Sequence, residues 1–437
     1  MSFSLIIAVM ETGARTLTAD QNLQVDRIFK DLITRRVFTK ENTEEDWNFK
    51  GSRKSWKSVV RNWIKWHVRD KEAATIIKAT GCLKDLKKET FRGQQDLKDK
   101  HPEFFEEYSL RDWNTITTKG VVIVRDAHGE MICLKVPIPQ VHIDTLEESD
   151  RYINTRPVHE HKRGLYEHRH WTCWWDFNAD SQSRLLGKKK QLIVSSEFKR
   201  DQAVMLPPAL DKKGTPLPDN VADRWMLENQ KLFRAVSNIM RLWMPDSWLH
   251  LTRTVPPKFL KKAKLPLMAP PYIGLAMNRK QKRDGQPHLD LMDDGQAPNI
   301  IIPYGRDWLG GGDLLLHPFN VKIRVYKGEV CFFYGRWCTH NVVGIEGERN
   351  VLDLFMNHRV QIWAQRQVKF WASNKKFGKI AEPTEQIEQD DKMGNNDGVI
   401  MEIMDLEDNG NSEEEGNDED DAEDNEYMPR KRIRISK

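Results

Sequence analysis

The sequence predicts an α+β protein whose core is a double-stranded β-helix, also called a jelly roll or cupin-like fold, flanked by helices. Short apolar runs separated by glycine turns fill residues 256–372, which is a spacing typical of jelly rolls. Apolar residues at helical spacing dominate residues 1–110 and return from Trp225 to Trp243. Residues 381–437 are acidic and poor in apolar residues, so we expect a disordered tail.

These patterns divide the 437 residues into three expected regions: a helical accessory region at 1–110, the main domain at 111–380, and the acidic tail. Within the first region, the stretch "RKSWKSVVRNWIKWHVRD" (Arg53 to Asp70) has apolar residues at helical spacing and basic residues on the other face. The apolar positions are Trp56, Val59, Val60, Trp63 and Trp66. We expect this face to pack on the core. A basic helix that approaches phosphates is the alternative.

A hairpin is predicted at the start of the main domain. The stretch "KGVVIVRDAHGEMICLKVP" (Lys119 to Pro137) has two β-rich runs around a turn at Asp126 to Gly129. Farther along, Trp225 to Trp243 again has apolar residues at helical spacing, which predicts helical structure, and strands dominate again after Pro256.

Composition excludes several classes of protein. No apolar run approaches the ~20 residues of a membrane span, so we expect no membrane segment. The five cysteines form no C-x-x-C pair and are interpreted as free thiols in a reducing compartment. The tract from His159 to Cys173 is rich in histidine, which can indicate zinc. It lacks the paired ligands of a closed zinc site, so a basic surface segment or a strand is favoured.

The net charge of +4 conceals a strong asymmetry. Glu382 to Tyr427 contains 20 acidic residues against the single Lys392, and residues 1–381 keep 63 basic and 45 acidic residues, an excess of 18 positive charges. Such a body favours a polyanionic partner. The tail either competes with that partner for the basic body or acts as a solubilising element. The last residues, "PRKRIRISK", resemble a nuclear import signal, so we expect a nuclear protein.

The chemistry-bearing motif is "GQPHLDLMDDG". His288 and Asp290 lie two residues apart, so in a strand they point to the same face. Downstream, "YGRWCTHNVVGIEGERNVLDLF" adds His340 after one strand and Arg349 at the start of the next. Two imidazoles and one carboxylate bind one face of Fe(II) and leave positions open for 2-oxoglutarate and O₂. The planar guanidinium of Arg349 suits the distal carboxylate of 2-oxoglutarate. A jelly roll with a structural histidine is the alternative.

The stretch from Pro270 to Arg359, which contains both motifs, resembles the oxygenase domain of the TET (ten-eleven translocation) and J-binding-protein family, particularly its compact fungal members. The resemblance is weaker from Arg111 onward, and residues 1–110 and the tail lie outside it. It implies Fe(II)- and 2-oxoglutarate-dependent oxidation of a methylated DNA base, with O₂ as cosubstrate and succinate and CO₂ as products. A cysteine-rich zinc module of the animal TET type is absent from the sequence.

The resemblance also implies roles for individual residues. The iron ligands would be His288, Asp290 and His340, and the 2-oxoglutarate partner would be Arg349. Arg283 matches a position that contacts the other end of the cosubstrate. Asp293 and His358 match positions that touch the flipped base. Asp293 needs a turn at "MDDG" to return toward the pocket, and His358 could instead cap the last strand.

We expect methylated duplex DNA as the partner of a monomeric enzyme. The target base should flip out of the duplex and stack against apolar side chains. Candidates for stacking are Tyr304, Trp308, Phe333 and Trp337. The basic stretch "NRKQKR" is interpreted as a loop whose Arg279, Lys280 and Lys282 contact phosphates, with a solvated hairpin as the alternative. The leading substrate is 5-methylcytosine, and N6-methyladenine is an alternative or second one. A protein hydroxylase and a DNA-binding protein without catalysis remain as competing interpretations.

Overall fold

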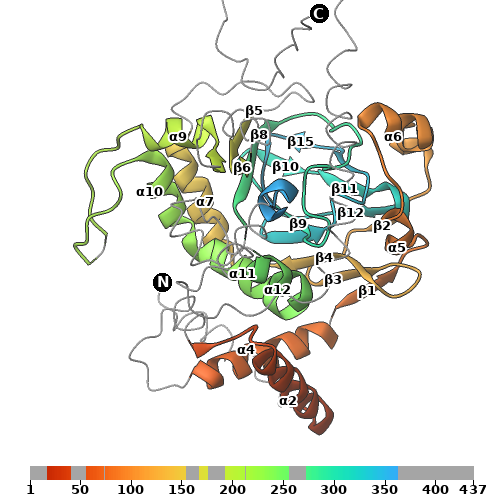
Figure 1. Cartoon of the computed structure of the whole chain (residues 1–437), viewed down its shortest axis with the longest axis horizontal. Helices are drawn as coiled ribbons and strands as arrows, with labels where there is room; N and C mark the ends of the chain where they lie inside the picture. The colour runs from red at the N-terminus through yellow and green to blue at the C-terminus, as the bar shows by residue number, and fades with distance from the viewer. Residues whose placement is uncertain are drawn as a thin grey trace, which may run out of the picture.

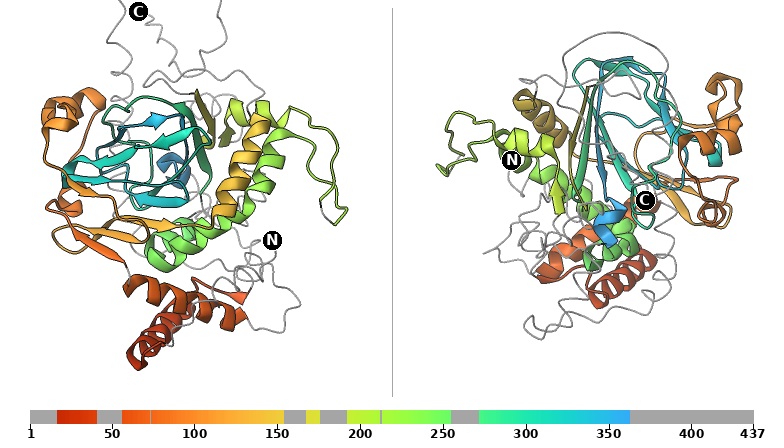
Figure 2. Two further views of the ribbon diagram at one scale, coloured as in Figure 1. Left: turned by 180° about the vertical axis from the view of Figure 1, so that it is seen from behind. Right: turned by 45° about the horizontal axis from the view of Figure 1, so that its top comes forward.

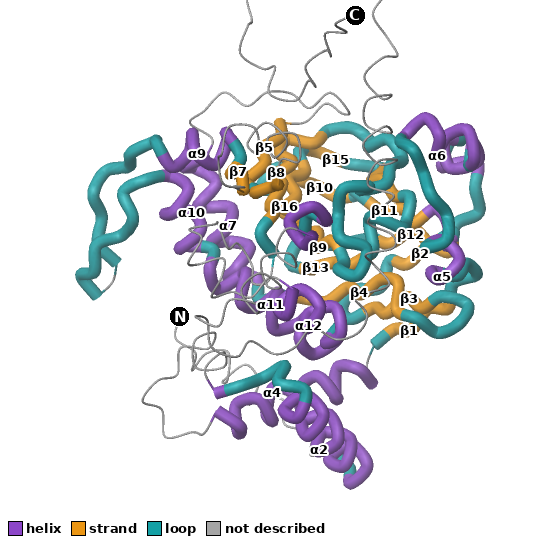
Figure 3. Tube along the Cα trace, viewed as in Figure 1, coloured by secondary structure: helices purple, strands orange, loops and turns teal. Residues whose placement is uncertain are grey.

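The computed structural model of the chain describes residues 17–40, 56–72, 74–153, 167–175, 192–211, 213–254 and 272–362. These residues form an α+β fold in which helices lie outside two main sheets (Figure 1; Figure 2). Figure 3 shows that the strands are gathered centrally and that most helices lie to one side of them. No helix of the described part is long and apolar enough to cross a membrane.

The larger sheet has eight strands. Its order across the sheet is β1 (Thr75–Lys78), β3 (Val122–Arg125), β4 (Met131–Pro137), β13 (Glu329–Phe333), β9 (Asn299–Tyr304), β16 (Arg349–Phe355), β8 (Gly274–Gln281) and β5 (Glu167–Trp171). All neighbours pair antiparallel except β1 and β3, which are parallel. Strand β16 therefore lies in the interior of the sheet, between β8 and β9.

The second sheet has four strands. They are β14 (His340–Val343), β11 (Asp313–Leu316), β12 (Val321–Ile323) and β2 (Asn114–Ile116). Two short pairs complete the strands: β10 (Trp308–Gly310) with β15 (Glu346–Gly347), and β6 (Cys173–Trp175) with β7 (Leu192–Val194). Ile301 and Phe333 of the larger sheet share one buried apolar cluster with Leu314 and Val321 of the smaller sheet. The two sheets are thus packed through a common core.

Five helices cover the other face of the larger sheet. They are α7 (Gln140–Ile153), α9 (Ser196–Gln202), α10 (Val221–Glu228), α11 (Gln230–Trp243) and α12 (Pro245–Thr254). Side chains alternate along β16, so Leu352 and Leu354 join the cluster beneath these helices, whereas Val351 joins the cluster between the sheets. The helical structure predicted from Trp225 to Trp243 is confirmed. It consists of two helices, α10 and α11, that meet at Asn229, whose side-chain amide donates to the Trp225 carbonyl.

The N-terminal region is helical at first but also supplies a strand. Helices α2 (Ala19–Thr34) and α4 (Trp56–Glu72) contact each other, and α2 begins with a capping box formed by Thr18 and Gln21. In α4, Val60 is buried and Trp63 packs on the core, as predicted, and Ile64 is buried as well. The side chain of Trp66 lies outside the described set. Strand β1 then extends the larger sheet. The region at 1–110 is therefore not purely helical, because β1 joins the main sheet.

Short elements follow β1. They are α5 (Leu83–Leu86), α6 (Gln94–Lys100), η1 (Pro102–Phe105) and η2 (Tyr108–Leu110), and η3 (His317–Phe319) lies between β11 and β12. The predicted hairpin is confirmed as β3 and β4. The Asp126 carboxylate closes its turn by accepting from the backbone N–H groups of His128 and Glu130.

The expectations for the histidine-rich tract and for the acidic tail concern residues that lie partly or wholly outside the described part of the chain. His159, His161 and the tail at 381–437 lie outside them, whereas Glu167–Trp171 forms an edge strand, as the non-zinc interpretation favoured. Free thiols are confirmed for Cys82, Cys133, Cys331 and Cys338.

Candidate metal centre

The structure brings His288, Asp290 and His340 together, as the motif predicted. One ligand atom from each residue lies within 4.8 Å of the others, and this is the only such cluster of three among the described residues. The backbones of His288 and His340 form an antiparallel bridge with two N–H to carbonyl bonds of 3.0 Å. The N–H of Asp290 donates to the Gly335 carbonyl at 3.1 Å. Backbone pairing therefore fixes all three positions.

Both histidines present the same ring nitrogen to the centre. Nδ1 of His288 lies 2.8 Å from the Gln286 carbonyl, and Nδ1 of His340 lies 2.9 Å from the Cys338 carbonyl. A carbonyl can only accept, so each Nδ1 carries the hydrogen and each Nε2 keeps its lone pair. The Nε2 atoms lie 3.7 and 3.5 Å from the Asp290 carboxylate. Burial lowers the pKa of His340 to about 4, so this imidazole is neutral near pH 7 and available to a metal ion.

The Asp290 carboxylate is held on its other side. Nδ2 of Asn299 donates to Asp290 Oδ2 at 3.1 Å. A Cβ at Gly335 would lie 2.3 Å from the same oxygen, so only glycine leaves room for the carboxylate here. Two imidazoles and one oriented carboxylate match the donor set of an Fe(II) site with open positions.

Arg349 provides a buried cation for a carboxylate ligand. Its residue is 1% exposed, and burial lowers its pKa to about 10. One nitrogen, Nη1, donates to Gln281 Oε1 at 3.2 Å, whereas Nε and Nη2 have no hydrogen-bond partner within the part of the chain that the structure describes. Unused donors on a buried cation are costly unless a ligand satisfies them. The residues present therefore fit the distal carboxylate of 2-oxoglutarate.

The surroundings of Arg349 are shaped to admit its side chain. A Cβ at Gly312 would lie 2.7 Å from Arg349 Cδ, and Gly312 has a φ of +70°, a left-handed conformation that favours glycine. The indole of Trp308 lies 5.6 Å from the guanidinium carbon. The negative charge of Asp313 raises the pKa of Arg349, which favours the charged guanidinium. The Asp313 carboxylate, however, already accepts a hydrogen bond from Arg324. A carboxylate ligand would therefore add the direct counter-ion that Arg349 lacks.

Asp293 and His358 come to the edge of the same site. The turn required at "MDDG" is present, because the N–H of Asp293 donates to the Asp290 carbonyl at 3.0 Å. Asp293 Oδ2 accepts from Asn299 Nδ2 at 2.6 Å. The N–H of His358 donates to the Met292 carbonyl, and Asp293 bridges Asn357. Contact of either side chain with a base stays a prediction.

Burial raises the pKa of Asp293 well above its ordinary value, and the nearby Asp290 raises it further. Both effects disfavour the charged form of this carboxyl group.

The basic stretch is not the phosphate-binding loop that we expected. Strand β8 continues through Gln281, and Arg279 is 3% exposed, with its Nε 3.5 Å from Asp150 Oδ2. Arg279 therefore lies beneath the helices and is not accessible to phosphates. Lys280 and Lys282 are on the surface, where they pair with Glu167 at 2.5 Å and Glu348 at 2.7 Å.

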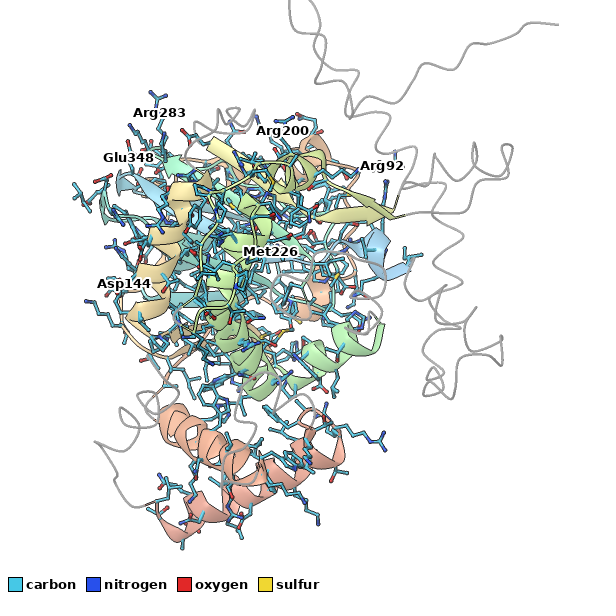
Figure 4. All side chains as sticks on the ribbon, turned by 90° about the vertical axis from the view of Figure 1, so that its left-hand side faces the viewer. Arg92, Asp144, Arg200, Met226, Arg283 and Glu348 are labelled. Atoms are coloured by element: carbon cyan, nitrogen blue, oxygen red, sulfur yellow. The ribbon has the colours of Figure 1, made fainter. Side chains whose placement is uncertain are left out.

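Arg283 is exposed, and its side chain projects outward from the body (Figure 4). Its contact with the cosubstrate stays a prediction.

The four aromatic candidates divide between the site and the core. The Phe333 ring lies 4.7 Å from that of His340, and Trp308 borders Arg349. Tyr304 is buried in the cluster beneath the helices, and Trp337 Nε1 donates to the Gly295 carbonyl. Asn299 and Gln281 are site residues that the sequence reasoning missed, because no local pattern marks an amide as the partner of a distant charged group.

No family model matches the chain, and no curated protein matches it. Among solved structures, NgTET1 in complex with 5mC DNA is 16% identical with a TM-score of 0.38, over 63% of this chain and 91% of that one. The viral collagen prolyl hydroxylase from Paramecium Bursaria Chlorella virus-1 is 12% identical with a TM-score of 0.25, over 52% and 96%. A Pseudomonas putida prolyl-4-hydroxylase is 10% identical with a TM-score of 0.26, over 52% and 92%. Likeness at this level assigns neither activity nor substrate.

Proposed function

We propose that the chain is an Fe(II)- and 2-oxoglutarate-dependent dioxygenase built on a double-stranded β-helix. The observation that carries this proposal is the three-ligand cluster together with Arg349, a buried guanidinium with two unused donors. The two packed sheets would form the β-helix, with β14 supplying His340 and β16 supplying Arg349.

In this proposal each residue of the site has a defined task. His288, Asp290 and His340 hold Fe(II), and Arg349 orients 2-oxoglutarate through its distal carboxylate. When bound, the metal and 2-oxoglutarate supply O₂-dependent oxidation of a C–H bond, with succinate and CO₂ as products. The protein positions the methyl group, fixes the tautomer of both imidazoles through their Nδ1–H bonds so that each Nε2 faces the metal, and encloses the reaction in the core between the sheets.

The substrate that we propose is the methyl group of 5-methylcytosine in DNA, oxidised to the hydroxymethyl and further forms. N6-methyladenine would be a second substrate. Three observations support a methylated base: the resemblance over Pro270 to Arg359, the excess positive charge of residues 1–381, and the placement of Asp293 and His358 at the site edge. The base would flip out of the duplex to reach the iron. The terminal "PRKRIRISK" supports a nuclear enzyme.

The test is a turnover assay with paired readouts. The purified chain with Fe(II) and 2-oxoglutarate is incubated with duplexes carrying 5-methylcytosine, N6-methyladenine or no methylation, and nucleosides and succinate are measured by mass spectrometry. We expect oxidised base and succinate together, and neither with His288→Ala or Asp290→Ala. Turnover on histone or ribosomal peptides alone would indicate a protein hydroxylase. DNA binding without succinate would indicate a non-catalytic protein.

A further inference from the structure

A single amide lies between two carboxylates of the site. Nδ2 of Asn299 is 3.1 Å from Asp290 Oδ2 and 2.6 Å from Asp293 Oδ2. Asn299 is 2% exposed and lies on β9, which is paired with β13 and β16 on its two sides. One of its neighbours is a candidate metal ligand, and the other is the candidate base-contacting residue.

The chemistry of the amide suits this place. A carboxamide nitrogen carries two N–H donors, and a carboxylate oxygen accepts. Asp293 is 8% exposed, and its proximity to Asp290 is unfavourable for two ionised groups. Asn299 can give one hydrogen to each without adding a further charge. A leucine of similar volume would leave both carboxylates without these bonds.

Local packing fixes the orientation of the amide. A Cβ at Gly335 would lie 2.8 Å from Asn299 Oδ1 and 2.3 Å from Asp290 Oδ2. The amide and the carboxylate thus lie together against the same glycine. This contact leaves little space for either group to turn away, so the hydrogen bond holds Asp290 in one orientation.

We propose that Asn299 is a positioning residue that orients Asp290 toward the metal and, through its second hydrogen, fixes Asp293 on the substrate side. It would thereby couple the metal ligand to base recognition. The part that concerns Asp293 rests on the proposed function. The part that concerns Asp290 requires only that the three-ligand cluster binds a metal ion.

The first measurement is metal affinity, which does not depend on turnover. Co(II) is titrated into the full chain by calorimetry under anaerobic conditions. Partners that orient metal ligands typically contribute 10- to 100-fold in affinity, so we expect Asn299→Leu to weaken Co(II) binding by roughly 10- to 100-fold. The matched control is Asn238→Leu. Asn238 is a buried asparagine of α11 whose Oδ1 accepts from Arg241, and its loss should lower stability without changing Co(II) affinity.

The second measurement tests the coupling to Asp293. The KM for a methylated duplex is determined for Asn299→Leu, Asp293→Ala and the double variant. If Asn299 acts through Asp293, the double variant should raise KM less than the product of the two single effects. If Asn299 had a purely structural role, Asn299→Leu would lower the melting temperature. The effects of the two single variants on KM would then multiply in the double variant.

The outcomes separate the two levels of the proposal. Co(II) affinity of folded Asn299→Leu within threefold of wild type would overturn the positioning role. If that variant does not fold, Asn299→Ser is measured in its place, with the same threshold. Wild-type protein that binds no Co(II) would overturn the proposed function as well. Weakened Co(II) binding in a protein that turns over no methylated base would support the positioning of Asp290 and reject only the substrate.

Discussion

Replacing Arg349 by methionine should have opposite effects on cosubstrate binding and on stability. Nε and Nη2 are the two unused donors of this buried side chain. Each hydrogen bond to a charged partner contributes about 1.5–3 kcal/mol, so losing the pair should cost roughly 3–6 kcal/mol of 2-oxoglutarate binding. At about 1.4 kcal/mol for each tenfold, the affinity should fall on the order of 100- to 10,000-fold. Arg349→Lys keeps the charge without the planar fork and should lose less.

The stability of the cosubstrate-free protein should move the other way. Burial lowers the pKa of Arg349 to about 10, and a lowered pKa for a cation means that the folded state disfavours the charge. At about 1.36 kcal/mol per pH unit, burying the charge costs on the order of 3 kcal/mol. Methionine removes this cost but leaves Gln281 without its partner, which offsets about 1 kcal/mol. Arg349→Met should therefore unfold at a higher urea concentration than wild type.

Two measurements test these expectations. Calorimetry with 2-oxoglutarate measures the expected loss of affinity, and urea unfolding without 2-oxoglutarate measures the expected gain in stability. The matched contrast is Arg169→Met, because Nη1 of Arg169 lies 2.6 Å from both carboxylate oxygens of Asp201 in a buried pair. Breaking that pair leaves an unpaired acid and should cost about 3–5 kcal/mol. If Arg349→Met were destabilised like Arg169→Met and bound 2-oxoglutarate within threefold of wild type, Arg349 would be a structural cation and the reasoning would fail.

Three further predictions concern the tail, pH and packing. Deleting Glu382 to Lys437 should tighten non-specific DNA binding, most at low salt; equal anisotropy titrations would leave the tail a solubility element. Burial lowers the pKa of His142 to about 4, so its neutral form contributes stability that is complete above about pH 6.5 and is lost as pH falls toward 4. His142→Leu should thus lose less stability between pH 7 and 4.5 in urea unfolding, and an unchanged pH profile would contradict this. Leu97→Ala should cost about 2–5 kcal/mol of unfolding free energy and weaken Co(II) binding; unchanged Co(II) affinity would show that its packing does not support the ligands.

The first two candidate metal ligands could be predicted because their signal is local. The two-residue spacing predicted that His288 and Asp290 face the same side, and the structure brings them together, although His288 forms only an isolated bridge with His340 outside the named strands. The donor set of Fe(II) then predicted a second imidazole, which His340 supplies. A turn at "MDDG" is required for Asp293 to return toward the pocket, and the structure has it. His340 lies far along the chain from this motif, so its place was predicted from the donor set and not from neighbouring residues.

Arg279 and Arg283 could not be placed in the same way. Whether each arginine is exposed depends on where β8 ends and on which face of the strand the residue occupies. Because side chains alternate between the two faces, an error of one residue in the predicted register places a side chain on the opposite face. The partner of Arg279 is Asp150 on α7, a contact that no local pattern reveals. Asn299 was missed for the same reason, because it is defined by the two carboxylates that it contacts.

Residues on the N-terminal side of the expected boundary at residue 110 pack behind the candidate metal ligands. Leu289 lies between His288 and Asp290 in the sequence, so alternation directs its side chain away from the centre. It is buried in a cluster with Leu97 of α6 and Phe104 of η1. The Gln94 side chain also donates to the Pro287 carbonyl. The segment that presents His288 and Asp290 is covered on its other side by residues 94–104. These residues lie before the expected boundary at residue 110 and support the candidate metal ligands by packing, whereas the division into three regions stays a prediction.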